Sequence, residues 1–120
     1  MNERASGVST HVLDAVRGEP AAGIVVRLER VDAGRVSELG RGATDADGRI
    51  GDFGTGALAA GTYRLVFATG PYLESAHSDE TAGAPFFPEV AVTFAADGHR
   101  LRYHVPLLLS PFCYSTYRGS

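Results

Sequence analysis

Residues 90–109 read VAVTFAADGHRLRYHVPLLL, and this segment contains the strongest hairpin signal in the sequence. Apolar side chains occupy every second position over residues 90–94 and again over residues 101–107. This alternation is typical of a β-strand with one buried face, because successive side chains of a strand point to opposite sides. Asp97-Gly98 lies between the two runs, and Asp-Gly favours a tight turn. The segment therefore predicts two antiparallel strands joined as a hairpin.

The same alternation recurs toward the N-terminus, over residues 24–29 and 63–68. Glycine-containing turn sequences separate these runs, and only residues 72–82 carry a short helical stripe of apolar side chains. Short strands at such spacing are typical of a sandwich. We therefore predict one all-β domain over residues 1–120, a two-sheet β-sandwich of seven or eight strands with one short helix.

Composition excludes several classes of function. The 120 residues include 11 basic side chains, all of them arginine, against 14 acidic ones, for a net charge of −3. Nucleic-acid binding is disfavoured because no basic cluster is present. The single cysteine, Cys113, excludes an internal disulfide framework and a cysteine-based zinc site. No apolar run is long enough to span a membrane and the first ten residues do not resemble a secretory signal, so we expect a cytoplasmic protein.

The strand that ends at Leu109 is apolar on both faces over residues 107–109. In so small a domain, a strand of this kind at a sheet edge is expected to be covered by another copy of the chain. Homo-oligomerisation is therefore predicted from the pattern alone.

Two histidines are candidates for acid–base chemistry, because imidazole titrates near neutral pH. His11 shares a strand face with Ser9, and His104 immediately precedes the point where its strand becomes apolar on both sides. Partial burial at such a junction changes a pKa. The alternative is that both lie on ordinary solvated faces. His77 and His99 are predicted to be surface residues.

Metal binding is not supported by the spacing of ligand-type residues. His99 and His104 are five positions apart, which places them on opposite faces of a strand. Asp45 and Asp47 resemble part of a calcium loop, but the acidic residues required at its first and last positions are missing. We predict instead a turn from which Arg49 emerges.

Nucleophilic catalysis is also weakly supported. Ser9 lacks the strained turn that serine nucleophiles occupy, and the aromatic neighbours of Cys113 predict a packed thiol. The C-terminal residues 110–120 contain three aromatic side chains, an arginine and several hydroxyls. Because domain ends usually fray into polar residues, this tail is expected to be docked or functional.

Five segments together resemble the transthyretin-related 5-hydroxyisourate hydrolases. They are STHVLD at 9–14, GEPAAG at 18–23, TDADGR at 44–49, YHVPLLLSP at 103–111 and the terminal YRGS at 117–120. The resemblance covers essentially the whole chain, and the terminal YRGS is its most specific part because it separates these hydrolases from transthyretin.

The resemblance implies a transthyretin-like β-sandwich that assembles as a homotetramer, a dimer of dimers, with active sites in the cleft between dimers. It implies that His11, Arg49 and His104 are catalytic, and that Tyr117 and Ser120 contact the substrate together with His11 and Arg49. The implied reaction is hydrolysis of 5-hydroxyisourate to 2-oxo-4-hydroxy-4-carboxy-5-ureidoimidazoline in urate degradation. No metal or organic cofactor is implied.

These residue types suit that chemistry. A histidine can deprotonate water near neutral pH, and the planar donors of Arg49 can bind the carbonyl oxygens of a flat ring. Whether His11 or His104 takes the proton stays open at this point. The alternative function is a transthyretin-like carrier without catalysis, which is expected to have apolar residues in place of these polar ones.

Overall fold

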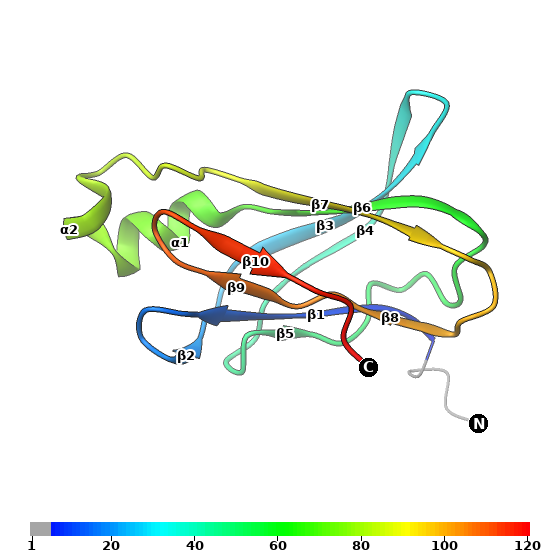
Figure 1. The fold of residues 1–120 in the computed structure, drawn as a ribbon, viewed down its shortest axis with the longest axis horizontal. Coiled ribbons are helices and arrows are strands. Elements are labelled where there is room, and N and C mark those ends of the chain that lie inside the picture. The colour runs from blue at the N-terminus through cyan, green and yellow to red at the C-terminus, as the bar shows by residue number, and fades with distance from the viewer. Residues whose placement is uncertain (1–5) are drawn as a thin grey trace.

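Two β-sheets packed face to face make up the computed structural model, which describes residues 6–120 (Figure 1). The elements are β1 (Gly7–Asp14), β2 (Glu19–Pro20), β3 (Val25–Asp32), β4 (Arg35–Ala43), β5 (Arg49–Ile50), β6 (Gly61–Phe67), α1 (Thr69–Ala76), α2 (Ser78–Thr81), β7 (Val90–Ala96), β8 (Arg102–His104), β9 (Leu107–Leu109) and β10 (Tyr114–Thr116). One sheet has the order β4-β3-β6-β7, and the other has the order β10-β9-β1-β2 with β5 and β8 also paired to β1. The predicted two-sheet sandwich is confirmed, although residues 6–120 form ten strands where seven or eight were predicted, because β2 and β5 are only two residues long. Residues 1–5, on which the prediction about a secretory signal partly depends, lie outside the described residues.

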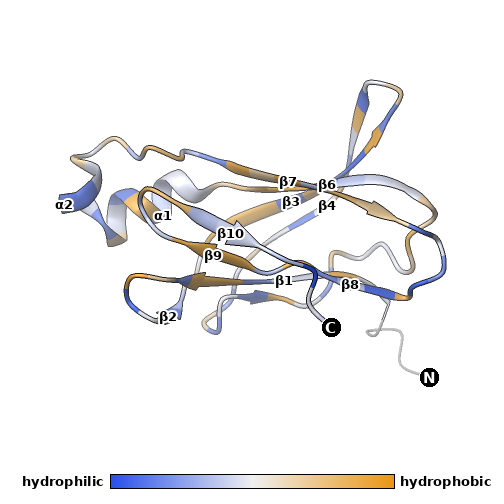
Figure 2. Ribbon diagram, viewed as in Figure 1, coloured by the Kyte–Doolittle hydropathy of each residue, from blue (hydrophilic) through white to orange (hydrophobic). Residues whose placement is uncertain are grey.

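The core lies between the sheets and follows the predicted alternation. Val26 and Leu28 are fully buried, as expected for the inward face of β3, and Ile24, immediately before the strand, is 1% exposed. Apolar residues concentrate along β3, β7 and β9, whereas α2 and the turn after β7 are hydrophilic (Figure 2). Burial of these side chains is the main favourable term that holds the two sheets together. No helix among residues 6–120 is long and apolar enough to cross a membrane.

β1 is the central strand of the sheet that carries the candidate site. Along one edge it pairs in parallel first with β8 and then with β9, and along the other it pairs with β5 and β2. Pro106 separates β8 from β9, because proline has no N–H group to donate to the ladder. The Thr10 hydroxyl donates to the carbonyl of Val105 (2.6 Å), and the Thr116 hydroxyl donates to that of Pro106 (2.7 Å). These bonds fix the interruption, so that His104 ends β8 at a defined position.

The predicted hairpin at Asp97-Gly98 is wrong. β7 pairs with β6 in one sheet and β8 pairs with β1 in the other, so this turn carries the chain between sheets. The Asp97 carboxylate accepts the backbone N–H groups of His99 (2.8 Å) and Arg100 (3.1 Å) and the hydroxyl of Tyr103 (3.0 Å). These bonds stabilise a wider corner than a two-residue turn and direct Tyr103 into the core.

The predicted helix over residues 72–82 is in fact two helices. α1 begins earlier, at Thr69, so that Pro71 lies in its first turn, where its missing N–H costs nothing. The helical run is interrupted at His77, whose backbone has φ −131° and ψ 46°, and α2 ends at Thr81. The interruption coincides with a buried hydrogen bond from the His77 side chain, described below.

The sequence predicts that the last strand ends at Leu109, but the structure has one more strand after it. β10 follows and pairs with β9, so β10 is the edge strand and all three of its residues are exposed. Leu107 and Leu109 face the core, whereas Leu108 is half-buried on the outer face. A packed thiol was predicted for Cys113, but this residue, in the loop before β10, is exposed. Its aromatic neighbours Phe112 and Tyr114 are exposed as well and do not cover it.

Candidate active site

The outer face of β1 brings the candidate residues together. Val8, Thr10 and Val12 are at most 1% exposed and face the core, whereas His11 and Leu13 are half-buried on the opposite side. Ser9 lies on this outer side too, although neighbouring groups cover it. The predicted alternation in this strand is therefore confirmed, and residues paired with its odd-numbered positions join the same outer face.

Arg49 lies directly beside His11, because the two residues are partners in the antiparallel pairing of β1 with β5. The turn before β5 presents Arg49 as predicted. Asp45 Oδ1 accepts the backbone N–H groups of Asp47 and Arg49, each at 2.9 Å. The Arg49 N–H bond, together with the charges of Arg49 and His11, lowers the pKa of Asp45.

Gly48 allows this turn to approach β1 closely. Its φ is +77°, a left-handed conformation that glycine adopts without strain, and a Cβ there would collide with the carbonyl oxygen of Val12. The Gly48 carbonyl accepts the Val12 N–H at 2.7 Å. Glycine is therefore required for β5 to hold Arg49 against the outer face.

His104 is placed on the same face by the parallel pairing of β8 with β1, in which its partner is Ser9. The Ser9 hydroxyl oxygen lies 2.8 Å from His104 Nδ1. Partial burial lowers the pKa of His104, and the nearby charges of Arg102, Arg49 and His11 lower it further. The surroundings of His104, including His11 and Arg49, therefore favour its neutral form.

The C-terminal tail is docked against His104. Gly119 forms a single antiparallel bridge with His104, and its N–H donates to the His104 carbonyl at 2.8 Å. A Cβ on Gly119 would lie 2.6 Å from Cδ2 of the imidazole ring. The ring is thus held between Ser9 on β1 and the backbone of the tail.

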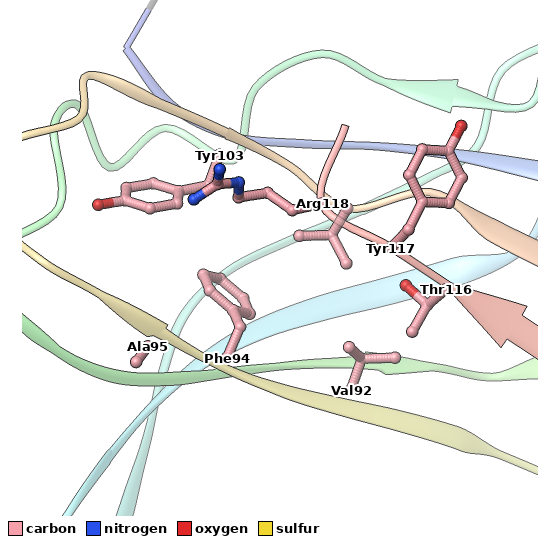
Figure 3. A pocket seen from close by; sticks show the side chains of 8 residues that line it. Val92, Phe94, Ala95, Tyr103, Thr116, Tyr117 and Arg118 are labelled. Atoms are coloured by element: carbon pink, nitrogen blue, oxygen red, sulfur yellow. The ribbon is translucent and has the colours of Figure 1, made fainter. Parts of the chain in front are cut away.

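The side chains of Tyr117 and Arg118 line a different space. A cavity of about 230 Å³ lies between β7 and the tail, and its lining includes Phe94, Tyr103, Tyr117 and Arg118. In Figure 3 the Tyr117 ring points away from Phe94 and Val92, whereas Arg118 extends toward Tyr103. Tyr117 is 60% exposed. Ser120 follows Gly119 and is also exposed. The structure therefore brings His11, Arg49 and His104 together, whereas within residues 6–120 the Tyr117 and Ser120 side chains form no hydrogen bond with them.

A second polar cluster lies at the far end of β1, and sequence reasoning missed it. His77, predicted to be a surface residue, is 3% exposed, and its Nε2 lies 2.7 Å from Asp14 Oδ2. The Tyr72 hydroxyl donates to the same oxygen at 2.6 Å. Burial would raise the pKa of Asp14, but hydrogen bonds from Tyr72, the Arg17 backbone and His77 lower it overall. Burial and the Asp14 carboxylate raise the pKa of Tyr72. This cluster ties α1 and α2 to β1. His99, by contrast, is exposed as predicted.

The site has no resemblance to a metal centre. Within residues 6–120, no three histidine, cysteine or acidic side chains gather closely enough to hold a metal ion. Two imidazoles and a guanidinium instead provide acid–base groups and a fixed positive charge on one exposed face. The sequence suggests Ser9 only as a weak candidate nucleophile, and its contact with His104 depends on the pairing of β8 with β1, whereas the sequence pattern predicts that β8 pairs with β7.

Fold and site together define a two-sheet β-sandwich protein with a histidine–arginine site on the outer face of one sheet. Residues 8–119 match the HIUase/Transthyretin family. The chain belongs to this family.

Individual relatives refine the comparison. A "5-hydroxyisourate hydrolase" from Caulobacter vibrioides is 44% identical over 115 residues, which span 96% of this chain and 99% of that protein. Among solved structures, the 5-hydroxyisourate hydrolase of Klebsiella pneumoniae has a TM-score of 0.77 and 35% identity, covering 94% of this chain and 98% of its own. The transthyretin of Sparus aurata has a TM-score of 0.81 and 32% identity, covering 93% and 95%. The fold is therefore similar to that of a 5-hydroxyisourate hydrolase and to that of a transthyretin. Only the residues of the site can distinguish between these two kinds of protein.

Proposed function

We propose that this protein is a hydrolase that opens the ring of 5-hydroxyisourate in urate degradation, giving 2-oxo-4-hydroxy-4-carboxy-5-ureidoimidazoline. The observation that carries the proposal is the adjacency of His11, Arg49 and His104 across three paired strands. Relatives over nearly the full chain that bear the name 5-hydroxyisourate hydrolase support the same substrate.

The reaction adds one water molecule across a ring amide. The water oxygen bonds to the amide carbonyl carbon while a histidine accepts the proton that the water loses. The carbonyl oxygen gains negative charge, which the Arg49 guanidinium stabilises. The C–N bond then breaks, and the departing nitrogen takes a proton from an imidazolium. The residues present supply each of these steps without a cofactor.

We further propose that Tyr117 and Ser120 complete the site. The Gly119 bridge to His104 supports this, because Ser120 directly follows Gly119 and Tyr117 precedes it by two positions. The Tyr117 ring, at the rim of the cavity, also points away from Phe94 and Val92 (Figure 3). A hydroxyl at each position is suited to the polar edges of the substrate ring. Arg118 is better suited to orient the tail.

We propose a homotetramer, a dimer of dimers, with the site in a cleft between subunits. Leu13 and Leu108 are register partners on the same outer face as His11, and both are half-buried in the single chain. A face that combines catalytic polar groups with leucines is suited to cover by another subunit. The exposed edge strand β10 offers unpaired backbone groups for a further contact. A location in the cytoplasm stays a prediction.

The alternative is a carrier that shares the fold, favoured only by the similarity to the Sparus aurata transthyretin. The two functions are separated by generating 5-hydroxyisourate from urate with urate oxidase and following its ultraviolet absorbance. Faster decay with micromolar protein supports the hydrolase, and decay at the spontaneous rate contradicts it. Light scattering of the same sample tests the tetramer, and an active monomer would exclude an intersubunit site.

A further inference from the structure

Within residues 6–120, the hydroxyl of Ser9 has one hydrogen-bond partner, His104 of the candidate site. Ser9 is 2% exposed, and its Oγ lies 2.8 Å from His104 Nδ1. Among residues 6–120, the structure gives Ser9 Oγ no second hydrogen bond. The direction of this one bond therefore decides where the hydroxyl hydrogen goes.

A neutral imidazole has one N–H donor and one bare nitrogen acceptor. If His104 Nδ1 carried the hydrogen, Ser9 would be the acceptor, and its buried hydroxyl hydrogen would have no partner. Leaving a buried donor unpaired costs about 1–3 kcal/mol. If Ser9 donates instead, both groups are satisfied and the ring hydrogen lies on Nε2.

The competing acceptor for a hydrogen on Nδ1 is the carbonyl of Ser9 itself. That carbonyl also accepts the Val105 N–H at 2.9 Å, and a bond to it from Nδ1–H would still leave the buried Ser9 hydroxyl hydrogen without a partner. The carbonyl raises the pKa of His104, but burial and the charges of Arg102, Arg49 and His11 outweigh it. These charges come from its own strand β8, from the neighbouring strand β1 and from β5 on the other side of β1. The neutral form of His104 is therefore favoured near pH 7, and this form can carry its hydrogen on either Nδ1 or Nε2.

We propose that Ser9 is a positioning residue that holds neutral His104 as its Nε2–H tautomer. This inference rests on the proposed hydrolase function for its consequence but not for the tautomer itself. With a hydrogen on Nε2 and a hydrogen bond on Nδ1, His104 has no bare nitrogen with which to deprotonate water. His11 is then the general base, which decides between the two histidines.

The division of roles gives a balanced reaction. His11 takes a proton from water as the water oxygen bonds to the amide carbonyl carbon. His104 Nε2–H and Arg49 donate hydrogen bonds to the carbonyl oxygen, which bears the negative charge. The C–N bond breaks, the proton on His11 passes to the departing nitrogen, and His11 returns to its neutral form. His104 keeps its proton throughout.

Nitrogen-15 NMR of the histidine rings in the substrate-free protein at pH 7.5 tests the tautomer directly. The His104 signals, assigned by their absence in His104→Ala, are expected to show hydrogen on Nε2. In Ser9→Ala the two tautomers should mix, and in Ser9→Thr, which keeps the hydroxyl, the Nε2–H form should return. Hydrogen on Nδ1 in the wild-type protein overturns the proposal, whatever the activity.

Kinetics of the same variants test the consequence. Ser9→Ala should lower kcat by about 10- to 100-fold with little change in KM, because it misplaces a group used in the transition state. Ser9→Thr should recover most of the loss. Ser115→Ala, which removes an exposed hydroxyl from β10, is the matched control and should be unaffected. Wild-type kcat in Ser9→Ala refutes the positioning role. An inactive wild-type protein with Nε2–H on His104 instead contradicts the proposed function alone.

Discussion

Gly119 lies so close to His104 that a methyl group on its Cα would approach the imidazole Cδ2 to 2.6 Å. The two residues are also joined through the backbone, by the 2.8 Å hydrogen bond from the Gly119 N–H to the His104 carbonyl. Only glycine therefore lets the C-terminal tail lie flat against this ring. The tail is a wall of the candidate site and not a frayed end.

Gly119→Ala is expected to displace the His104 ring and lower kcat by about 10- to 100-fold, because small misplacements of a catalytic group are costly. The midpoint of thermal unfolding should change little, since the tail is at the surface. The matched control is Gly42→Ala, where a Cβ meets only Ile50 at an ordinary 3.7 Å. Equal activity in the two variants would contradict a role for this contact.

Asp45 fixes the turn that presents Arg49. Asp45→Ala removes the acceptor of the Asp47 and Arg49 N–H groups and should lower activity by about 10-fold through a mobile Arg49. Asp52 makes the same kind of bond to Gly54 N–H, at 2.8 Å, away from the paired strands. Asp52→Ala should therefore keep full activity in the same assay. A similar loss in both would show that general loosening, not Arg49, is responsible.

His104 should titrate below the ordinary histidine pKa of 6.5, because burial and nearby positive charges disfavour the imidazolium. Proton NMR titration of its ring measures the midpoint, and Arg49→Ala should move that midpoint upward. The unfolded chain binds this proton more readily than the folded one. Stability from this group is therefore present above pH 6.5 and is lost as pH falls through the folded pKa. A midpoint above 6.5 would contradict the electrostatics of the site.

Asp14 anchors the helices to β1 through two oxygens. Oδ2 accepts from Tyr72 and His77, and Oδ1 accepts the N–H groups of Val16 and Arg17. Asp14→Asn places an amide group against those partners and should cost about 3 kcal/mol in urea unfolding. Exposed Asp79→Asn on α2 is the control and should cost almost nothing.

The same variant has a predicted pH dependence. Since the pKa of Asp14 is lowered from 3.8, its stabilisation is present above that pH and is lost as pH falls through the folded pKa. The difference in unfolding free energy between the wild-type protein and Asp14→Asn should therefore narrow below about pH 4. A difference in unfolding free energy that stays constant with pH would mean that the negative charge of Asp14 does not contribute to stability.

Local patterns in the sequence predicted much of the fold. Alternation identified the inward face of β3 because burial selects apolar residues at every second position, whatever the strand pairs with. The prediction of a hairpin was wrong because the Asp97 side chain forms hydrogen bonds with Tyr103 and with the backbone beyond the turn. The Asp-Gly dipeptide alone does not reveal these bonds. His77 was misplaced because its partner, Asp14, is 63 residues away.

The candidate site was less predictable from residues alone. β5 has two residues, too few for a periodic pattern, so the prediction that Arg49 and His11 share one site came only from the family resemblance, and their strand pairing was not predicted. Ser9 and His104 are 95 residues apart and meet through a parallel pairing that no local signal marks. Long-range register is set by the packing of the whole sandwich.

The decay of 5-hydroxyisourate, compared at one protein concentration for the wild type and for His11→Ala, Arg49→Ala and His104→Ala, tests the assigned reaction and site most directly. The wild type should accelerate the decay strongly, and each variant should lose about 100-fold or more while keeping its assembly by light scattering. Decay at the spontaneous rate with the wild type, or wild-type rates in all three variants, would contradict a hydrolase built on these side chains.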